Sequence, residues 1–433
     1  MSVDTVPGRG GLFRHADFRR LFLAHGVSQL GAQVTYLALP LVAITYLHAS
    51  TFEIGVLTTL ESLAFLVIGL PAGAWCDRMR RRRVLITTDL VRAGALLSIP
   101  VAAALGVLSV WQLYTVVLIH GACTVFFDVS GLAFLPSLIG RERLIEGNGK
   151  MESARQVALA AGPTLAGFLV EALKAPFALV ADAVSYLWSA AWLSRIRAPD
   201  VLPPRADRQP LRVEIAEGLR FVLRNPVLRA VAATGAIAVV GISISRAILV
   251  LFLVRQLGLT AGTIGLLFSV GSVASIGGAM VTTRLARRLG APRALIGFCG
   301  IAGAGSLLIP LTGNGWALGF LVVGETLQMA SIVAYNVTQV SYRQRICPDH
   351  LLGRMNATMR FLMWGTTPVG GLLGGVLGTA IGLRPTLWTA GALLVVATLP
   401  LVLSPLGPAA VRGDREFLQE PVLLGQKADG EQA

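Results

Sequence analysis

The sequence predicts an all-α polytopic membrane protein, with twelve transmembrane helices in two pseudo-symmetric six-helix bundles. The first observation is composition: of 433 residues, 54% are hydrophobic and 14% are charged, and the mean hydropathy is +0.70. The second is that apolar segments of about twenty residues, long enough to cross a bilayer, recur along the whole chain. The third is that the two halves repeat one another. This composition is that of a membrane protein and not of a soluble domain.

The apolar segments are separated by short connections, with one exception. The predicted spans cover residues 19–47, 52–76, 83–106, 111–139, 149–172, 176–195, 227–255, 260–283, 293–312, 316–342, 354–381 and 384–404. The long connection contains VEIAEGLRFVLRNPVLR, which predicts an amphipathic helix on the inner membrane surface, with Pro226 opening the seventh span. The expected domains are an N-terminal bundle (1–196), a cytoplasmic linker with this helix (197–226), a C-terminal bundle (227–404) and a disordered cytoplasmic tail (405–433).

The basic residues indicate how the chain is oriented. The net charge of +14 would suggest a nucleic-acid partner in a soluble protein. Here most lysines and arginines fall in connections on one side, and only Lys174, Arg255 and Arg384 fall on the other. The positive-inside rule makes the basic side cytoplasmic. We therefore expect a multi-pass protein of the cell inner (cytoplasmic) membrane with both termini cytoplasmic, which contacts membrane lipid and no nucleic acid.

The sequence lacks patterns that would indicate an enzyme. Its four cysteines have no paired spacing, so neither disulfides nor a metal site is indicated. Metalloprotease, hydrolase and phosphate-binding motifs are also absent from it, which leaves a membrane-embedded enzyme or receptor as the weaker alternative. The basic start and long first apolar run predict an uncleaved helix and not a signal peptide. We expect a monomer without cofactor or metal that is not an enzyme.

An arginine-rich connection follows the second span. Residues 69–86 read GLPAGAWCDRMRRRRVLI and contain the pattern Gly73-x3-Asp77-Arg78-x2-Arg81-Arg82. Each arginine would cost about 2.5–3.5 kcal/mol at the centre of a membrane helix, so this stretch is predicted to be a cytoplasmic turn. An ordinary positive-inside loop would explain the arginines, but not the acid and the glycine at this spacing.

This pattern resembles the loop between the second and third helices of the major facilitator superfamily. Arg80 stands where that family has a glycine, which changes the turn but keeps the charge pattern. In the family this loop is thought to latch the inner gate shut while the outer side is open. The resemblance therefore implies a gating loop, formed by Gly73, Asp77, Arg78, Arg81 and Arg82.

The repeat extends the resemblance over nearly the whole chain. LIGRERLIEGNGKMESARQ before the fifth span matches RICPDHLLGRMNATMRF before the eleventh, with Leu144 facing Leu351 and Asn148 near Asn356. Two such halves around a membrane-normal axis, with a site at mid-membrane, form the major facilitator architecture. With AEGLRFVLRNPVLR, these stretches resemble the macrolide-efflux and enterobactin-exporter branch of drug:proton antiporters.

That resemblance implies export of a small amphipathic molecule, such as a drug, an antibiotic or a siderophore, by proton antiport and alternating access. An uncoupled or differently coupled facilitator of a lysolipid or metabolite in the same fold is the alternative. Collapse of transport by a protonophore would separate the two.

The fifth span carries a second family pattern. It reads Ala158-x3-Gly162-Pro163-x2-Ala166-Gly167, which is similar to the antiporter signature G-x3-G-P-x2-G-G with alanine at two glycine positions. Small residues allow helices to approach closely, and proline allows a bend. Generic small-residue packing is the alternative explanation.

Ionisable residues inside the spans are candidates for proton coupling, because burying them is costly unless they are used or paired. Glu61, Glu325 and Arg246 are expected at a similar depth, roughly 14 Å from the outer surface at 1.5 Å per residue. A buried carboxyl without a partner binds a proton readily, and one beside Arg246 stays ionised. Glu325 and Asp128 are the leading proton carriers, followed by Glu61. The alternative is that these acids form static ion pairs.

Polar stripes in the first and tenth spans predict a substrate cavity. The first span carries His25, Gln29, Gln33 and Tyr36 on one face, and the tenth carries Gln328 and Asn336 near Glu325. Polar faces in a membrane turn toward a cavity or a neighbouring helix. The predicted cavity residues are Gln29, Gln33, Tyr36, Arg246, Gln328 and Asn336.

The remaining acids in the spans are expected to be solvated or locally paired. Asp182 and Glu171 lie near the predicted outer helix ends and are expected to be solvated. Asp89 and Arg92 are spaced i,i+3 and are expected to form a local pair that supports the cytoplasmic loop.

Overall fold

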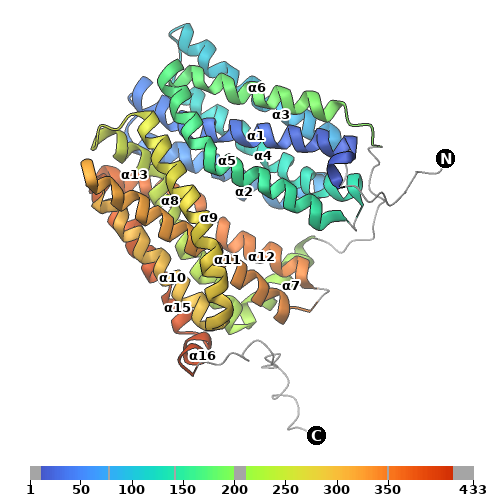
Figure 1. Cartoon of the computed structure of the whole chain (residues 1–433), viewed down its shortest axis with the longest axis vertical. Coiled ribbons are helices and arrows are strands. Elements are labelled where there is room, and N and C mark those ends of the chain that lie inside the picture. Colours follow the sequence, from blue (N-terminus) through green and yellow to red (C-terminus); the bar gives the residue numbers. More distant parts are fainter. Residues whose placement is uncertain (1–10, 77–78, 141–142, 199–210, 349–350, 413–433) are drawn as a thin grey trace, which may run out of the picture. The chain divides into compact units, whose positions relative to one another are not determined.

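The computed structural model describes residues 11–76, 79–140, 143–198, 211–348 and 351–412, and all regular structure in these ranges is helical (Figure 1). Within them, twelve helical segments are long and apolar enough to cross a membrane, as the hydropathy pattern predicts. The chain divides into two compact units. The first comprises Met1–Arg205 with Gly258–Ser269, and the second Ala206–Leu257 with Val270–Ala433. The predicted bundle and linker boundaries themselves stay a prediction.

Six long helices build the first unit. They are α1 (Ala16–Leu41, prolonged by a wider turn at Val42–Tyr46), α2 (Thr51–Cys76), α3 (Arg81–Ala104), α4 (Val110–Ile139), α5 (Leu144–Leu173) and α6 (Ala175–Ser194). Helix α1 packs against both α5 and α6, while α3 packs against α4 and α6. Phe18, Phe134 and Leu193 are buried in an apolar core near one end of the unit. Burial of such side chains stabilises the unit by about 1.5–3 kcal/mol each.

The remaining helices repeat this order with more interruptions. They are α7 (Leu211–Arg224), α8 (Pro226–Arg255), α9 (Ala261–Leu289), α10 (Ala291–Leu308), α11 (Gly319–Ile346), α12 (Leu352–Trp364), α13 (Thr367–Ala380), α14 (Leu383–Val396), α15 (Leu399–Val402) and α16 (Leu406–Arg412). Helix α8 begins as predicted at Pro226, and the Asn225 side chain accepts hydrogen bonds from the next two backbone N–H groups.

The predicted eleventh span, 354–381, is not one continuous helix. Helix α12 ends at Trp364 and α13 begins at Thr367. Pro368 lacks an N–H group, and its ring would clash with the carbonyl four residues earlier, which is that of Trp364. Hydropathy detected the span correctly, because both pieces are apolar, but it does not register the break.

The predicted amphipathic helix is α7, and its apolar face packs against α12. Val222 is fully buried in the core of the second unit. A Cβ atom on Gly218 would lie 2.8 Å from the backbone oxygen of Arg354, so the two helices touch at a residue without a side chain. The guanidinium of Arg354 also pairs with the carboxylate of Glu217. These contacts fix α7 to the second unit.

Candidate functional site

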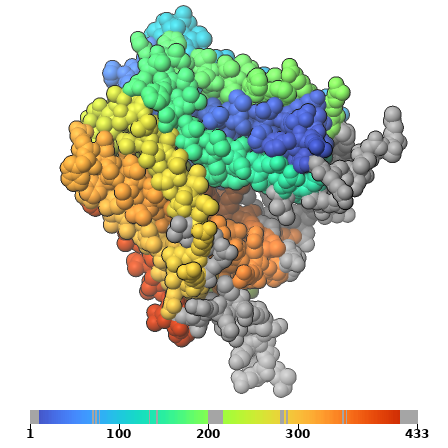
Figure 2. Space-filling view, in the orientation of Figure 1, coloured from blue at the N-terminus to red at the C-terminus, as the bar shows by residue number. Residues whose placement is uncertain are grey.

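The polar stripe of α1 follows helix α5. Gln33 packs on Gly162, where an added Cβ atom would lie 2.6 Å from the Cβ of Gln33. One end of the stripe is His25, which lies within electrostatic range of Arg155 and Glu152 on α5. Figure 2 shows the two helices side by side on the surface of the first unit. The structure therefore joins the predicted stripe to the predicted signature.

The stripe keeps some of its surface open. Gln29 and Gln33 are half-buried, and Tyr36 is 43% exposed. A side chain that is neither enclosed nor fully exposed can pack on its neighbour and still present a polar group to a bound molecule. This arrangement suits the predicted cavity role of these three residues, which stays a prediction.

The signature in α5 also contacts the first turns of α9, which belong to the same unit. A Cβ atom on Gly167 would lie 2.5 Å from the backbone oxygen of Ala261, and one on Gly265 would lie 3.1 Å from the Cα of Gly167. Beside Pro163, the backbone N–H of Thr164 donates a hydrogen bond of 3.0 Å to the Ser269 hydroxyl. The small residues thus allow backbone-to-backbone contact, as their spacing predicts.

In the second unit, Glu325 and Arg246 are electrostatic neighbours. Glu325 on α11 is half-buried, and the charge of Arg246 on α8 acts on its carboxyl group. Arg246 and Asn336 are exposed, whereas Gln328 is only 3% exposed. Gln328 lies where α10 and α11 pack closely, since a Cβ atom on Gly305 would lie 2.9 Å from its backbone nitrogen. Among the predicted cavity residues of this unit, Gln328 is therefore the one enclosed by protein.

The other two predicted proton carriers lie at the surface of the first unit. Glu61 on α2 and Asp128 on α4 are both exposed. At Glu61 the two helices touch, because a Cβ atom on Gly121 would lie 2.7 Å from the Glu61 backbone oxygen. Ionisable groups in membrane helices almost always face a bundle interior or a water-filled cavity.

The gating loop is only partly described. Asp77 and Arg78 lie outside the described residues, and Gly73 falls within α2. Arg81 opens α3, and the next residue, Arg82, donates a hydrogen bond to the carbonyl of Ile196 just beyond α6.

A carboxylate at the start of α1 binds the same segment. Asp17 pairs with Arg20 at 2.5 Å and accepts hydrogen bonds from the backbone N–H groups of Arg197 and Ala198. These contacts and that of Arg82 join the ends of α1, α3 and α6 in one unit.

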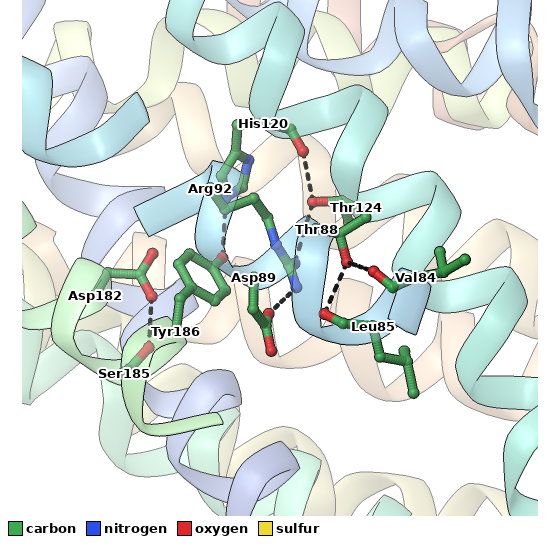
Figure 3. A network of polar contacts seen from close by, with 10 residues as sticks. All are labelled: Val84, Leu85, Thr88, Asp89, Arg92, His120, Thr124, Asp182, Ser185 and Tyr186. Atoms are coloured by element: carbon green, nitrogen blue, oxygen red, sulfur yellow. Dashed lines mark hydrogen bonds and ion pairs between the residues drawn. The ribbon is translucent and has the colours of Figure 1, made fainter. Parts of the chain in front are cut away.

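A cluster of polar side chains lies between α1, α3, α4 and α6 (Figure 3). The sequence interpretation did not identify it as a site. We call it the buried polar cluster; its members are Thr35, Asp89, Arg92, His120, Thr124, Asp182, Ser185 and Tyr186. They come from α1, α3, α4 and α6.

Arg92 lies at the centre of the cluster. Its guanidinium pairs with Asp89 at 2.5 Å and lies 4.4 Å from the ring centre of Phe127 and 4.2 Å from that of Tyr186. The Tyr186 hydroxyl is 2.9 Å from Nε2 of His120. Arg92 is 4% and Asp89 0% exposed. The predicted i,i+3 pair is confirmed, but it is buried among other polar groups within the unit.

The expectation for Asp182 is wrong, since it is 0% exposed and not solvated. It accepts hydrogen bonds from the hydroxyls of Thr35 and, at 2.9 Å, Ser185. Gly31 of α1 lets the two helices approach at this point, because a Cβ atom there would lie 2.7 Å from the Cβ of Ser185. A signal was present in the sequence: Asp182, Ser185, Tyr186 and Ser189 are spaced i, i+3, i+4 and i+7, which places them on one helix face.

No group in the described ranges has the composition of a metal site: clusters of three or more His, Cys, Asp or Glu that could hold an ion are absent there. The arrangement instead offers proton-binding carboxyls, paired arginines and half-buried amides. Such groups can bind protons and small polar or charged molecules.

Comparison with known proteins identifies the wider group. The model of the Major Facilitator Superfamily matches residues 21–365. The multidrug efflux pump Tap of Mycolicibacterium fortuitum is 26% identical over 400 residues, covering 88% of this chain and 91% of its own. The enterobactin exporter EntS of Salmonella typhi is 24% identical over 421 residues, covering 94% and 95%.

Solved structures share the fold. The nucleoside transporter NupG aligns with a TM-score of 0.72 and 11% identity, over 89% of this chain and 98% of its own. A bacterial homologue of the iron transporter ferroportin, in its inward-facing state, aligns with a TM-score of 0.69 and 17% identity, over 91% and 99%. The predicted twelve-helix transporter fold is confirmed, as is the expectation of a transporter and not an enzyme.

Proposed function

The chain belongs to the major facilitator superfamily, and from this premise we propose that it exports a small amphipathic organic molecule in exchange for protons. The observation that carries the proposal is the signature in α5, where Gly162 contacts the α1 stripe and Gly167 contacts α9. Small residues at both contacts let α5 lie close to α1 and to the first turns of α9, which is the packing that the antiporter signature implies. The efflux and export named for Tap and EntS support the outward direction.

We propose that polar side chains of α1 in the first unit, and of α8 and α11 in the second, contact the substrate. Gln29, Gln33 and Tyr36 would contribute from α1, and Arg246 and Asn336 from the second unit. Gln328 is buried, so it fits a role in supporting its neighbours better than direct contact with the substrate. Amides and a tyrosine offer both donors and acceptors, which suits a substrate with few charges.

Glu325 is the leading proton carrier in this proposal. With the Arg246 charge nearby, the carboxylate is stabilised; when substrate or a change of state removes that influence, the protonated form gains. Proton binding and substrate binding would then both depend on the charges of Glu325 and Arg246. Asp128 and Glu61, both exposed, are further carriers.

The arginine-rich loop would act as the inner gate. Asp77 and Arg78 would make ion pairs that exist in one state and break in the other. Arg82, bound to the carbonyl of Ile196, supports this role by tying the start of α3 to the end of α6. The protein would work as a monomer in the cytoplasmic membrane, with both termini cytoplasmic and its basic loops on anionic lipid.

Expression in an efflux-deficient bacterial host tests the proposal. The expected result is reduced sensitivity to at least one class of amphipathic compound in a chemically diverse panel, with accumulation of that compound restored by a protonophore. Transport that survives the protonophore would favour the uncoupled lysolipid or metabolite facilitator. Unchanged sensitivity together with inward accumulation would overturn export.

A further inference from the structure

The buried polar cluster holds two carboxyl groups and one guanidinium. Arg92 pairs with Asp89. Asp182 makes no ion pair within the described part of the chain, and its two oxygens accept hydrogen bonds from the hydroxyls of Thr35 and Ser185. A buried carboxylate without a cation is costly, and it reduces that cost by binding a proton. Two carboxylates and one guanidinium carry a net charge of −1. The cluster is therefore neutral when one of its carboxyl groups binds a proton.

The second unit shows that the fold does not need these charges. Helices α6 and α14 begin in the same way, after a residue with positive φ, Lys174 (67°) and Gly382 (89°). Counted from the two helix starts, Asp182 corresponds to Ala390 and Tyr186 to Leu394.

The same count on the neighbouring helices gives the same result. Measured from the starts of α3 and α10, Asp89 corresponds to Cys299 and Arg92 to Ala302. All four counterparts in the second unit are at most 7% exposed. One bundle therefore fills these positions with small or apolar side chains, and the other fills them with charges. Packing alone does not explain the charges, since replacing buried ion pairs by apolar groups is often neutral or stabilising.

Some polar atoms in and beside the cluster lack a close hydrogen-bond partner among the described residues. Among the described residues, Nε of Arg92 is buried without a hydrogen bond. Oδ2 of Asp89 and the nearby hydroxyl of Ser189 on α6 also lack a partner within hydrogen-bond distance, although Ser189 is close enough to stabilise the Asp89 carboxylate. Buried polar groups are nearly always paired, so each exception calls for an explanation. A cluster that gains and loses a proton would leave some groups unpaired in one of its states.

We infer that the buried polar cluster is a proton-binding site in which Asp182 is the carrier and Arg92, paired with Asp89, is its counter-charge. The step makes and breaks one O–H bond at a carboxyl oxygen of Asp182. Burial favours the protonated form, while the donors Thr35 and Ser185 stabilise the carboxylate, so both forms are accessible. That the proton bound here, like that of Glu325, is exchanged for substrate rests on the proposed function.

Charged and titratable groups reach the cluster from three of the helices around it, and Thr35 of α1 donates its hydroxyl to Asp182. From α3 they are Asp89 and Arg92; from α4, His120, Cys123 and Asp128; and from α6, Tyr186. Asp128 is exposed and lies within electrostatic range of Tyr186. It is the exposed member of this set.

Infrared spectroscopy of the full-length protein in lipid vesicles tests the site without transport. Wild type is expected to show the carbonyl band of a protonated carboxyl at neutral pH, which disappears as the pH is raised. Asp182→Asn has nearly the same shape and still accepts a hydrogen bond, and it should lose this band. Glu53→Gln, at a partly exposed position in the first turn of α2, should keep it. An unchanged band in folded Asp182→Asn would overturn the inference.

A second variant keeps the test decisive if Asp182→Asn does not fold. Ser185→Ala removes one hydroxyl donor from the carboxylate, so the band should persist to higher pH than in wild type. An identical pH profile would count against Asp182 as the carrier.

Transport measurements separate this inference from the proposed function. If wild-type vesicles do not respond to an imposed pH gradient, the proposed antiport fails on wild type alone. If wild type responds, Asp182→Asn should lose the acceleration by the gradient while retaining exchange of labelled for unlabelled substrate. An equal response of the variant would leave antiport standing and overturn the role of Asp182.

Discussion

At the scale of single residues, burial separates the ionisable groups of the spans into two classes. Glu61, Asp128 and Arg246 are exposed on their own units. Asp89 and Asp182 are fully buried among other polar groups. Depth along the sequence puts Glu61 and Arg246 at a similar level, Asp182 near an outer helix end and Asp89 near the cytoplasmic loop. Depth does not show which of these side chains is exposed and which is buried and paired.

The first prediction concerns Glu325. Glu325→Gln keeps the shape of the side chain and removes its ability to bind a proton, so the proton release that accompanies substrate addition to vesicles should fall to background. A pH-sensitive dye inside and outside the vesicles measures this release. Glu53→Gln serves as the control and should release protons as wild type does. Normal release from Glu325→Gln would remove Glu325 as a carrier.

Gly167 gives a prediction about packing. Its added Cβ would lie 2.5 Å from the backbone oxygen of Ala261, which cannot move aside as a side chain can. Gly167→Ala should therefore destabilise the protein by about 1–3 kcal/mol and slow transport. Thermal unfolding of the purified protein measures the loss.

The matched control lies on the same helix. An added Cβ at Gly149 meets nothing within 4 Å, so Gly149→Ala should be neutral or stabilising by up to about 1 kcal/mol through helix propensity. Equal effects of the two substitutions would show that helix propensity and not the α5–α9 contact decides the outcome.

At the scale of elements, hydropathy predicted where helices lie, and local chemistry decided where they break. Trp364 ends α12 because Pro368 cannot continue the hydrogen-bond ladder. Helix α7 was predicted from its amphipathic pattern, but the pattern does not say what covers the apolar face. The structure answers with α12, through Gly218 and Val222.

The contact between α7 and α12 can be tested by charge reversal. Glu217→Arg should lower the thermal unfolding temperature modestly, since a partly exposed ion pair is worth about 0.2–1 kcal/mol and the reversal adds repulsion toward Arg354. The double variant with Arg354→Glu should recover most of the loss. A double variant no more stable than Glu217→Arg would mean that the pair does not hold α7 in place.

At the scale of the whole molecule, the orientation in the membrane is the next prediction. Met79 and Val107 flank α3 at opposite ends and are 46% and 66% exposed. In a cysteine-free background, Val107→Cys should react with a membrane-impermeant thiol reagent on intact cells. Met79→Cys should react only after the membrane is opened. The reverse pattern would place the arginine-rich loop outside and refute the proposed orientation.

The sequence by itself determined the number of spans and the repeat of two halves, and it predicts the side on which the arginines lie. These properties depend on composition along the chain, because about twenty apolar residues cross a bilayer whatever their neighbours are. Only the tertiary structure decided which polar faces meet. Rotation of a helix about its axis is fixed by packing, so Gln33 on Gly162, α7 on α12, and the burial of Asp182 beside Thr35 could not be predicted from hydropathy.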